Sequence, residues 1–240
     1  MFLKKITLLR DKVPSYQKYP FTIPSIHHLG ELKITKPITF FVGENGSGKS
    51  TLLEAIADKC GFHTAGGGRN NVYEVHEADA ALGDFIRLSW MPKITNGFFL
   101  RAETFYHFAS YLDEIEGADS LKHYGGKSLH HQSHGESFLS LFKNRFGKKA
   151  IYLLDEPEAA LSPQRQLTFL RILHDLTKEK DCQFIIATHS PILLGFPDAA
   201  LIEFTEEGLK ETLYQDTSHY IITKYFLENR TQYLAEILKD

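Results

Sequence analysis

The chain has 240 residues, of which 42% are hydrophobic and 24% charged, and its formal net charge is -3. This composition is ordinary for a globular protein with a substantial core, and it provides no overall positive charge that would argue for nucleic acid. Cys60 and Cys182 are the only cysteines, which excludes a disulfide framework and fits a reducing compartment. No apolar run approaches the roughly 20 residues that span a bilayer, and the N-terminus lacks a signal-peptide pattern. We therefore expect a cytoplasmic protein with no direct membrane insertion.

The first half of the chain predicts strands around one glycine-rich turn. Strand patterns occupy residues 3–9, 31–43 and 84–90. Helical apolar spacing occupies residues 49–61, which end in a glycine, and residues 101–115. Residues 65–71 read "AGGGRNN", a turn or loop.

The second half alternates helices with buried strands. Helical patterns occupy residues 137–147, 162–180 and 220–238, the last with an apolar stripe. Near-continuous apolar runs at 149–157 and 182–191 predict strands buried on both faces of a parallel sheet. A hairpin is expected over 199–214, turning at Glu207-Gly208. Strands alternating with helices predict an α/β fold with a mostly parallel sheet. No linker divides the chain, so we expect a single domain over residues 1–240.

The glycine-rich turn has the spacing of a phosphate-binding loop. It follows a predicted strand and opens a predicted helix, which is the context that this motif requires. Its glycines let backbone N–H groups point at phosphate oxygens, and the helix N-terminus adds partial positive charge. Lys49 can reach the β- and γ-phosphates, and the Ser50 hydroxyl can bind Mg²⁺. The expected phosphate clamp consists of Gly43, Glu44, Asn45, Gly46, Ser47, Gly48, Lys49, Ser50 and Thr51.

Polar residues follow both buried strands of the second half. Asp155 and Glu156 end the first, where ligands of open α/β sheets bind. Asp155 is suited to hold Mg²⁺, and Glu156 can polarise an attacking water. His189 ends the second strand, where it could reach a γ-phosphate. We therefore predict that Glu156 and His189 are catalytic and that Ser50 and Asp155 are the metal ligands.

A histidine-rich stretch, "LHHQSHGESFLSLF", begins at Leu129. His130, His131 and His134 could bind a metal, but no cysteine or second ligand cluster is available to complete a site. The alternative is a loop that starts a helix and meets a phosphate with its backbone N–H groups.

The ordered motifs "GENGSGKST", "AIYLLDEPEAALSP" and "ATHSP" resemble the Walker A, Walker B, D-loop and switch histidine of ATP-binding cassette (ABC) ATPases. That family carries a signature, typically Leu-Ser-Gly-Gly-Gln, shortly before Walker B. The matching residues here are 132–136, "QSHGE", in which Ser133 and Gly135 agree. The resemblance implies that Ser133 and Gly135 face the γ-phosphate held by the other subunit of a dimer. Further stretches resemble small stand-alone ATPases, often labelled AAA-type, closer to the DNA-repair and chromosome-maintenance branch than to importers.

The resemblance implies a P-loop NTPase fold of ABC type, with an antiparallel β portion beside the parallel sheet. A helical signature region, about residues 95–146, would lie between Walker A and Walker B. The implied cofactors are ATP and Mg²⁺, and the implied assembly is a homodimer induced by ATP. A further protein partner is left open, as is nucleic acid, for which Lys143–Lys149 is the one basic run.

Two departures from the family pattern bear on function. Lys93 aligns with the glutamine that meets Mg²⁺ and the membrane subunit in transporter cassettes, and a lysine cannot bind Mg²⁺. The aromatic residue that stacks on adenine is not defined, with Tyr19 and Phe21 as candidates. The Lys93 substitution and the unusual signature weigh against a transporter subunit. Two alternatives to a stand-alone ATPase stay open: the ATP-binding subunit of a transporter with a separate membrane protein, and a nucleic-acid-linked ATPase in repair or defence.

Overall fold

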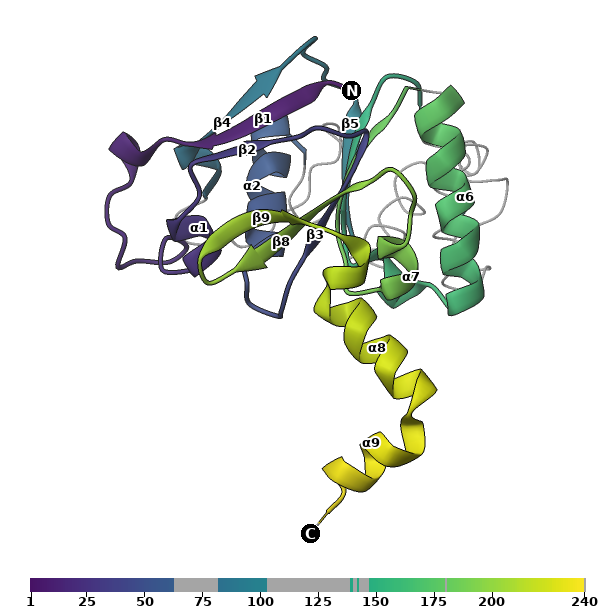
Figure 1. Ribbon diagram of the computed structural model, residues 1–240. Coiled ribbons are helices and arrows are strands. Elements are labelled where there is room, and N and C mark those ends of the chain that lie inside the picture. Colours follow the sequence, from purple (N-terminus) through teal and green to yellow (C-terminus); the bar gives the residue numbers. More distant parts are fainter. Residues whose placement is uncertain (63–81, 103–138, 140–141, 143–146, 180, 240) are drawn as a thin grey trace, which may run out of the picture.

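The structure is a computed structural model that describes residues 1–62, 82–102, 139, 142, 147–179 and 181–239. Two β-sheets form its centre, with helices on both sides of the larger one (Figure 1). The C-terminal helices extend away from this body.

The smaller sheet is antiparallel and has the strand order β2-β1-β4. Its strands are β1 (Leu3–Leu8), β2 (Glu31–Lys33) and β4 (Ile86–Trp90). Ile6 on the central strand pairs with Leu32 on one side and Leu88 on the other. Leu3, Ile6 and Leu8 of β1 are buried and its other residues are half-buried, as expected for a sheet with one face on the core.

The larger sheet has six strands in the order β5-β6-β7-β3-β8-β9. The first five are parallel, and β9 pairs antiparallel with β8. The strands are β3 (Ile38–Val42), β5 (Gly97–Arg101), β6 (Ile151–Asp155), β7 (Gln183–Ala187), β8 (Ala200–Thr205) and β9 (Gly208–Thr212). This arrangement confirms the expected α/β fold with a mostly parallel sheet and an antiparallel portion. The carboxyl ends of its parallel strands therefore meet at one edge.

Successive side chains of each central strand enter different cores. Phe41 packs with α2 and the smaller sheet, whereas Phe40 packs with Phe169 and Leu173 on the opposite face. All residues of β3, β6 and β7 are buried because both faces are covered. The helices are α1 (Pro24–His27), α2 (Lys49–Cys60), α6 (Pro163–Glu179), α7 (Pro191–Leu194), α8 (Ser218–Glu228) and α9 (Arg230–Ile237). Short 3-10 helices lie at Arg10–Lys12, Leu82–Phe85, Pro157–Ala160 and Tyr214–Asp216.

A buried amide joins the two sheets. The Gln183 side chain is fully buried on β7, and its Oε1 accepts hydrogen bonds from the backbone N–H groups of Phe2 (2.9 Å) and Leu3 (2.8 Å). Its Nε2 donates to the Leu3 carbonyl at 2.9 Å. The Gln183 amide thus provides hydrogen-bond partners for backbone groups at the start of β1, where β1 approaches the larger sheet.

Three sequence predictions require correction. Residues 31–43 are two strands rather than one, because Pro37 interrupts the pattern and the halves join different sheets. Arg101 ends strand β5 instead of starting a helix, because its segment pairs in parallel with β6. The C-terminal helix predicted over 220–238 begins at Ser218 and breaks at Asn229.

The remaining helix prediction, residues 137–147, can be compared at few positions. Leu139 and Phe142 are helical, and most of the segment lies outside the described residues, as do residues 65–71 and 103–115.

Candidate functional site at the carboxyl edge of the parallel sheet

The glycine-rich loop connects β3 to α2 at the carboxyl edge of the sheet. Gly48 begins the helix in the left-handed conformation, at φ 96°, which glycine adopts without strain. A Cβ atom on Gly48 would lie 2.9 Å from Ser25 Oγ and 3.0 Å from Ile23 Cγ2. The Ser25 hydroxyl donates a hydrogen bond to the Ser47 carbonyl. The loop is therefore held against α1, and glycine at 48 is required by both space and backbone conformation.

Lys49 lies beneath this loop with its side chain turned inward. It is 4% exposed, and its Nζ donates to the carbonyl oxygens of Gly43 and Glu44 at 2.8 Å each. Burial lowers the pKa of Lys49, although the carboxylates of Glu156 and Asp155 oppose that shift. A buried ammonium group held by two carbonyl groups and facing carboxylates is well placed to bind an anion that enters the loop.

Asp155 receives donors from two elements. The Ser50 hydroxyl on α2 donates to Asp155 Oδ1 at 2.9 Å, and Arg101 Nε on β5 donates to Oδ2 at 3.0 Å. Arg101 also forms an ion pair with Glu54 on α2. Although burial opposes the charge of Arg101, Glu54 and Asp155 outweigh it and raise the pKa of the guanidinium. Asp155, itself 3% exposed, is thus fixed between α2 and β5.

The donor set of Ser50 and Asp155 fits a magnesium ion. A carboxylate and a hydroxyl oxygen are hard ligands of the type that Mg²⁺ prefers, and Mg²⁺ normally keeps several waters beside one or two protein ligands. Among the described residues, Arg101 is the cation that meets the second Asp155 oxygen.

Glu156 and His189 face each other across the ends of β6 and β7. Glu156 is in the left-handed region at φ 49°, and its N–H donates to the Ala187 carbonyl at 2.9 Å. His189 Nε2 lies 3.6 Å from Glu156 Oε1, too far for a hydrogen bond but close enough for an electrostatic contact. The Glu156 side chain is 42% exposed, so water can reach it. A positive φ outside glycine is uncommon and is often found at functional positions.

His189 has further partners that local sequence motifs do not reveal. Its backbone N–H donates to Glu158 Oε1 at 2.6 Å, and burial raises the pKa of Glu158. Its Nδ1 lies 2.9 Å from Nε2 of His219 on α8. Burial lowers the pKa of His189, with Lys49 and His219 adding to the effect.

The structure brings together the predicted phosphate clamp, both predicted metal ligands, Glu156 and His189. Ser133 and Gly135 lie outside the described residues, as do His130, His131 and His134. Sequence reasoning missed Arg101, Glu54 and His219. Only the apolar run that ends at Arg101 could have indicated the first, and nothing in the local pattern marks the others.

The candidate adenine-stacking residues differ in exposure. Phe21 is 1% exposed and packs edge-on against Phe85, so it belongs to the core. Tyr19 is 58% exposed, and its hydroxyl lies 3.3 Å from Thr51 Oγ1 in the phosphate loop. Tyr19 therefore remains as the candidate beside the site.

Lys93 does not occupy the position assumed from the motif alignment. It is exposed and follows β4, which belongs to the smaller sheet. The strand beside β6 is β5, and the cation that it carries to Asp155 is Arg101. In the described residues, Arg101 and not Lys93 contacts Asp155, so no contact supports the assignment of Lys93 to the place of the transporter glutamine.

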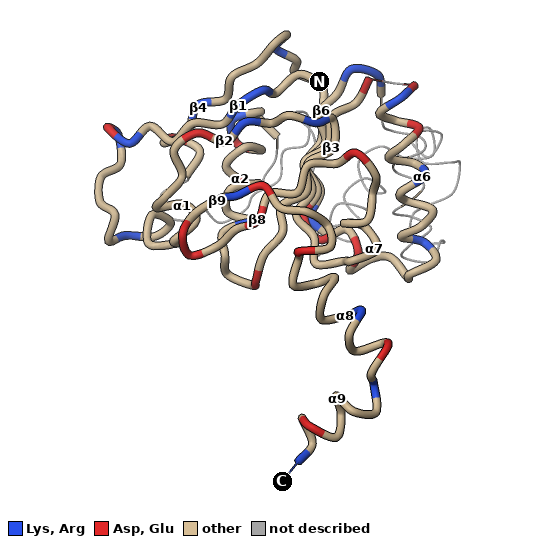
Figure 2. Tube along the Cα trace, in the orientation of Figure 1, with Lys and Arg blue, Asp and Glu red and all other residues tan. Residues whose placement is uncertain are grey.

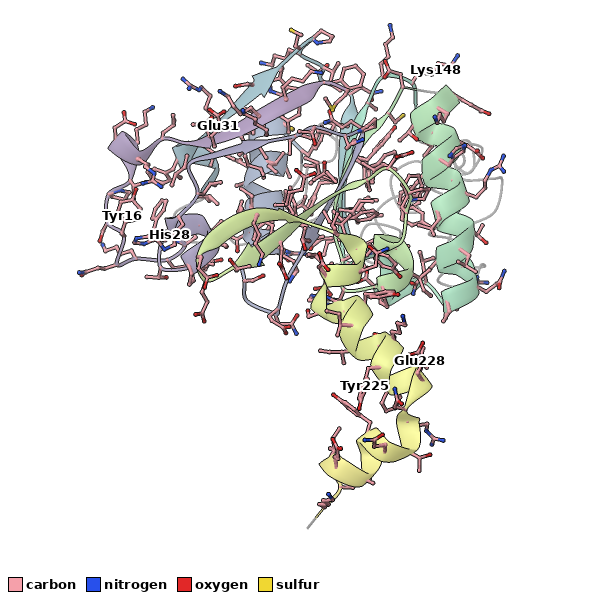
Figure 3. The ribbon with its side chains drawn as sticks, viewed as in Figure 1. Tyr16, His28, Glu31, Lys148, Tyr225 and Glu228 are labelled. Atoms are coloured by element: carbon pink, nitrogen blue, oxygen red, sulfur yellow. The ribbon has the colours of Figure 1, made fainter. Side chains whose placement is uncertain are left out.

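Charges of both signs occur on the smaller sheet, on α6 and on α8–α9 (Figure 2). Within the basic run 143–149, the described Lys148 and Lys149 precede β6 and lie at the edge of the sheet opposite Asp155. Figure 3 shows Lys148 far from the C-terminal helices. In the described part of the chain, this run is thus not part of the site.

Known proteins resemble this chain in sequence over parts of its length and in fold. The family model described as "AAA domain" matches residues 23–98, and that described as "AAA ATPase domain" matches residues 128–194. An ABC transporter solved in an inward-facing conformation has a TM-score of 0.53 at 16% identity, covering 93% of this chain and 88% of that one. The SMC head domain from Thermotoga maritima has a TM-score of 0.50 at 19% identity, covering 88% and 98%. These two structures share the fold of P-loop ABC ATPases with this chain.

Two curated proteins are similar to this chain in sequence. The protein ea59 of Escherichia phage lambda is 48% identical over 48 residues, which are 20% of this chain and 9% of that protein. The zinc import ATP-binding protein ZnuC of Photobacterium profundum is 26% identical over 161 residues, which are 63% of this chain and 58% of that protein. Together with the fold and the family models, these similarities support an ABC-type ATPase of the AAA/ABC-like group. None of the helices in the described part of the chain has the length and apolar character that crossing a bilayer requires.

Proposed function

We propose that this chain binds ATP with Mg²⁺ at the carboxyl edge of its parallel sheet and hydrolyses it in a dimer closed around two nucleotides. The observation that carries the proposal is the 2.9 Å hydrogen bond between Ser50 and Asp155, 105 residues apart in the chain. It joins the end of the phosphate loop to the end of β6, and these are the two oxygen donors that a nucleotide-bound Mg²⁺ requires.

Each described residue has a distinct part in the proposed reaction. Backbone N–H groups of residues 43–51 bind the phosphates, and Lys49 exchanges its carbonyl partners for β- and γ-phosphate oxygens. Ser50 and Asp155 hold Mg²⁺, which when bound neutralises charge on the phosphate oxygens. Glu156 accepts a proton from the attacking water as the bond between the γ-phosphorus and the bridging oxygen breaks. His189 contacts the γ-phosphate, and the products are ADP and phosphate.

The dimer is the part of the proposal that rests on sequence. Ser133 and Gly135 would complete the partner's site, so that each phosphate loop faces the signature of the other subunit. The exposure of Glu156, at 42%, supports this arrangement, because the γ-phosphate side of the site is open in a single chain. We further propose that residues 1–240 form one ABC-type domain, with the region of about 95–146 carrying the signature.

The direct test measures nucleotide binding and phosphate release by the purified chain with and without Mg²⁺. We expect Mg²⁺-dependent release of phosphate from ATP, and we expect Lys49→Ala to bind ATP at least tenfold more weakly because it removes a charged donor. The matched control is Lys178→Ala on the exposed face of α6. Equal ATP binding by wild type and Lys49→Ala would contradict the proposed phosphate site.

A second candidate function is the ATP-binding subunit of a transporter. The similarity to a zinc import ATP-binding protein over 63% of this chain favours it. Co-purification of the tagged chain with a membrane protein from its own cells would support this function. Hydrolysis stimulated by DNA would instead support a nucleic-acid-linked role.

A further inference from the structure

His189 and His219, which come from different parts of the chain, contact each other beside Glu156. His189 follows β7, and His219 lies in the first turn of α8, whose N-cap is Thr217. Their facing nitrogens, Nδ1 of His189 and Nε2 of His219, are 2.9 Å apart. The rings are tilted by 52° with centroids 5.0 Å apart, so the contact is through the nitrogens and not a parallel stack.

Burial favours the neutral form of both rings, and two neutral rings at 2.9 Å share one proton between their facing nitrogens. Burial lowers the pKa of each histidine. Lys49 lowers the pKa values further, whereas Glu44 opposes the shift at both rings. Asp155 opposes it at His189 and Glu203 at His219. A hydrogen bond between two neutral imidazoles requires a proton on one facing nitrogen and a lone pair on the other, which leaves two arrangements.

The surroundings of the outer nitrogen decide between these arrangements. Nε2 of His189 is buried, has no hydrogen-bond partner among the described residues, and lies 3.6 Å from the Glu156 carboxylate. A lone pair there would face a carboxylate oxygen, whereas an N–H would be attracted to it. The proton of His189 is therefore on Nε2, and His219 donates through its own Nε2–H.

The contact at Nδ1 of His219 agrees with donation from His219 to His189. Its Nδ1 then carries a lone pair, and the Ser218 hydroxyl lies 3.5 Å from it, at the long limit of a hydrogen bond. Donation runs from Ser218 to His219 and from His219 to His189. The last donor in the series, Nε2–H of His189, points toward Glu156.

We propose that His219 is a positioning residue that fixes His189 in the Nε2–H tautomer, so that His189 donates to the γ-phosphate when ATP is bound. This rests on the proposed function of His189. Because His219 belongs to α8, which extends from the body of the protein (Figure 1), the orientation of a residue in the ATP site depends on how the C-terminal helices are seated. A displacement of α8 would remove the donor to His189 without touching the phosphate loop.

The experiment compares three substitutions at one position. His219→Gln retains an Nε2–H donor near the original one, His219→Asn has its donor one bond too short, and His219→Phe has none. We expect His219→Phe and His219→Asn to lower kcat by about 10- to 100-fold, as loss of an orienting partner commonly does. Most of the activity should remain in His219→Gln, and ATP affinity should be little changed in all three. His174→Phe, at an exposed position of α6, is the matched control.

A second readout does not depend on hydrolysis. Nitrogen-15 spectra of labelled histidines report which ring nitrogen carries the proton, and the His189 signals are assigned by their absence in His189→Gln. We expect Nε2–H in wild type and His219→Gln, and loss of the single tautomer in His219→Phe. An Nδ1–H tautomer in wild type, or an unchanged tautomer in His219→Phe, would overturn the inference. If the spectra agree but wild type hydrolyses no ATP, the proposed function fails and the His219 assignment stands.

Discussion

Asp155 and Glu156 are adjacent carboxylates with different surroundings. Asp155 is 3% exposed and accepts hydrogen bonds from Ser50 and Arg101, whereas Glu156 is 42% exposed on its side chain and faces His189. Asp155 is the last residue of β6, whereas Glu156 follows the strand in the left-handed region at φ 49° and precedes a 3-10 helix. One carboxylate is thus fixed for a cation, while its neighbour stays accessible to water.

Glu156→Gln tests this division at the residue scale. The amide keeps the size of the side chain but cannot accept the proton of the attacking water. We expect kcat to fall by about 100-fold or more with ATP affinity retained, and an ATP-bound dimer to accumulate in gel filtration. The matched control is Glu228→Gln on α8, which is exposed and should hydrolyse ATP like wild type. Wild-type turnover by Glu156→Gln would refute its assignment as general base.

Tyr19 permits a test of adenine recognition. Its ring is exposed beside Thr51, and an aromatic ring that stacks on a base contributes about 1–3 kcal/mol, or roughly 5- to 150-fold in Kd. We expect Tyr19→Ala to weaken ATP binding by an amount in this range, and Tyr19→Phe to bind nearly as well as wild type. Fluorescence titration with a labelled ATP measures both. Unchanged affinity in Tyr19→Ala would exclude Tyr19 as the stacking residue.

Elements of the fold determine which side chains can meet at the edge. β5, β6, β7 and β3 lie side by side and run in parallel, so Arg101, Asp155, the segment leading to His189 and the phosphate loop all follow or end strands at one edge. The smaller sheet contributes none of these groups. Its position depends on the buried contact between Gln183 and the backbone of Phe2 and Leu3.

Gln183→Leu should destabilise the protein although it lies outside the site. The substitution leaves two buried N–H groups and one carbonyl without the amide, and each buried unpaired group costs about 1–3 kcal/mol. Partial relaxation at the chain terminus reduces the sum, so we expect about 2–4 kcal/mol by denaturant unfolding. Gln164→Leu, an exposed substitution on α6, should change stability by less than about 0.5 kcal/mol. Equal stability of the two variants would show that the amide does not join the sheets.

At the scale of the whole molecule, the C-terminal helices have no buried residues. Exposed apolar side chains occur on both, and Figure 3 shows Tyr225 on α8, well away from the sheets. His219, at the start of α8, contacts His189 and so links this extension to the proposed ATP site. The hydrogen bond between His219 and His189 therefore connects the C-terminal helices to a residue of the proposed reaction.

Mixing two inactive variants tests the proposed dimer. Lys49→Ala loses phosphate binding, and Ser133→Arg introduces a bulky cation where the partner's phosphate is expected. In a mixed dimer of the proposed symmetry, one site carries both changes and the other carries neither. Random pairing makes about half of the dimers mixed, so up to roughly a quarter of the sites are intact. We expect phosphate release to return on mixing, and a chain that carries both changes to stay inactive.

The outcomes of mixing distinguish a wrong assignment of the signature from a requirement that both sites act together. Wild-type hydrolysis by Ser133→Arg alone would refute the signature assignment. If both variants are inactive and mixing restores nothing, a covalently linked dimer of one wild-type half and one Lys49→Ala half decides whether the two sites must act together, because it keeps one site intact and inactivates the other. Release of phosphate by that linked dimer would show that one intact site suffices, so that failure of mixing counts against the trans model, and its absence would show that the two sites depend on each other.

The local sequence was sufficient to predict the glycine-rich turn before α2, the helix α2 itself, the buried strands β6 and β7, and the position of Asp155-Glu156 at the end of β6. Each depends on spacing within a short segment, where a glycine pattern or an apolar run defines both the element and its end. The same reasoning joined residues 31–43 into one strand, because it cannot assign two neighbouring strands to different sheets.

Only the tertiary structure decided which distant residues share the site. Arg101 meets Asp155 across 54 positions, His219 meets His189 across 30, and Gln183 meets Phe2 across 181. It also decided that Phe21 is in the core while Tyr19 is exposed. Such contacts arise when strands pair and helices pack, and the pairing order of strands far apart in the chain leaves no trace in the local pattern of any one of them.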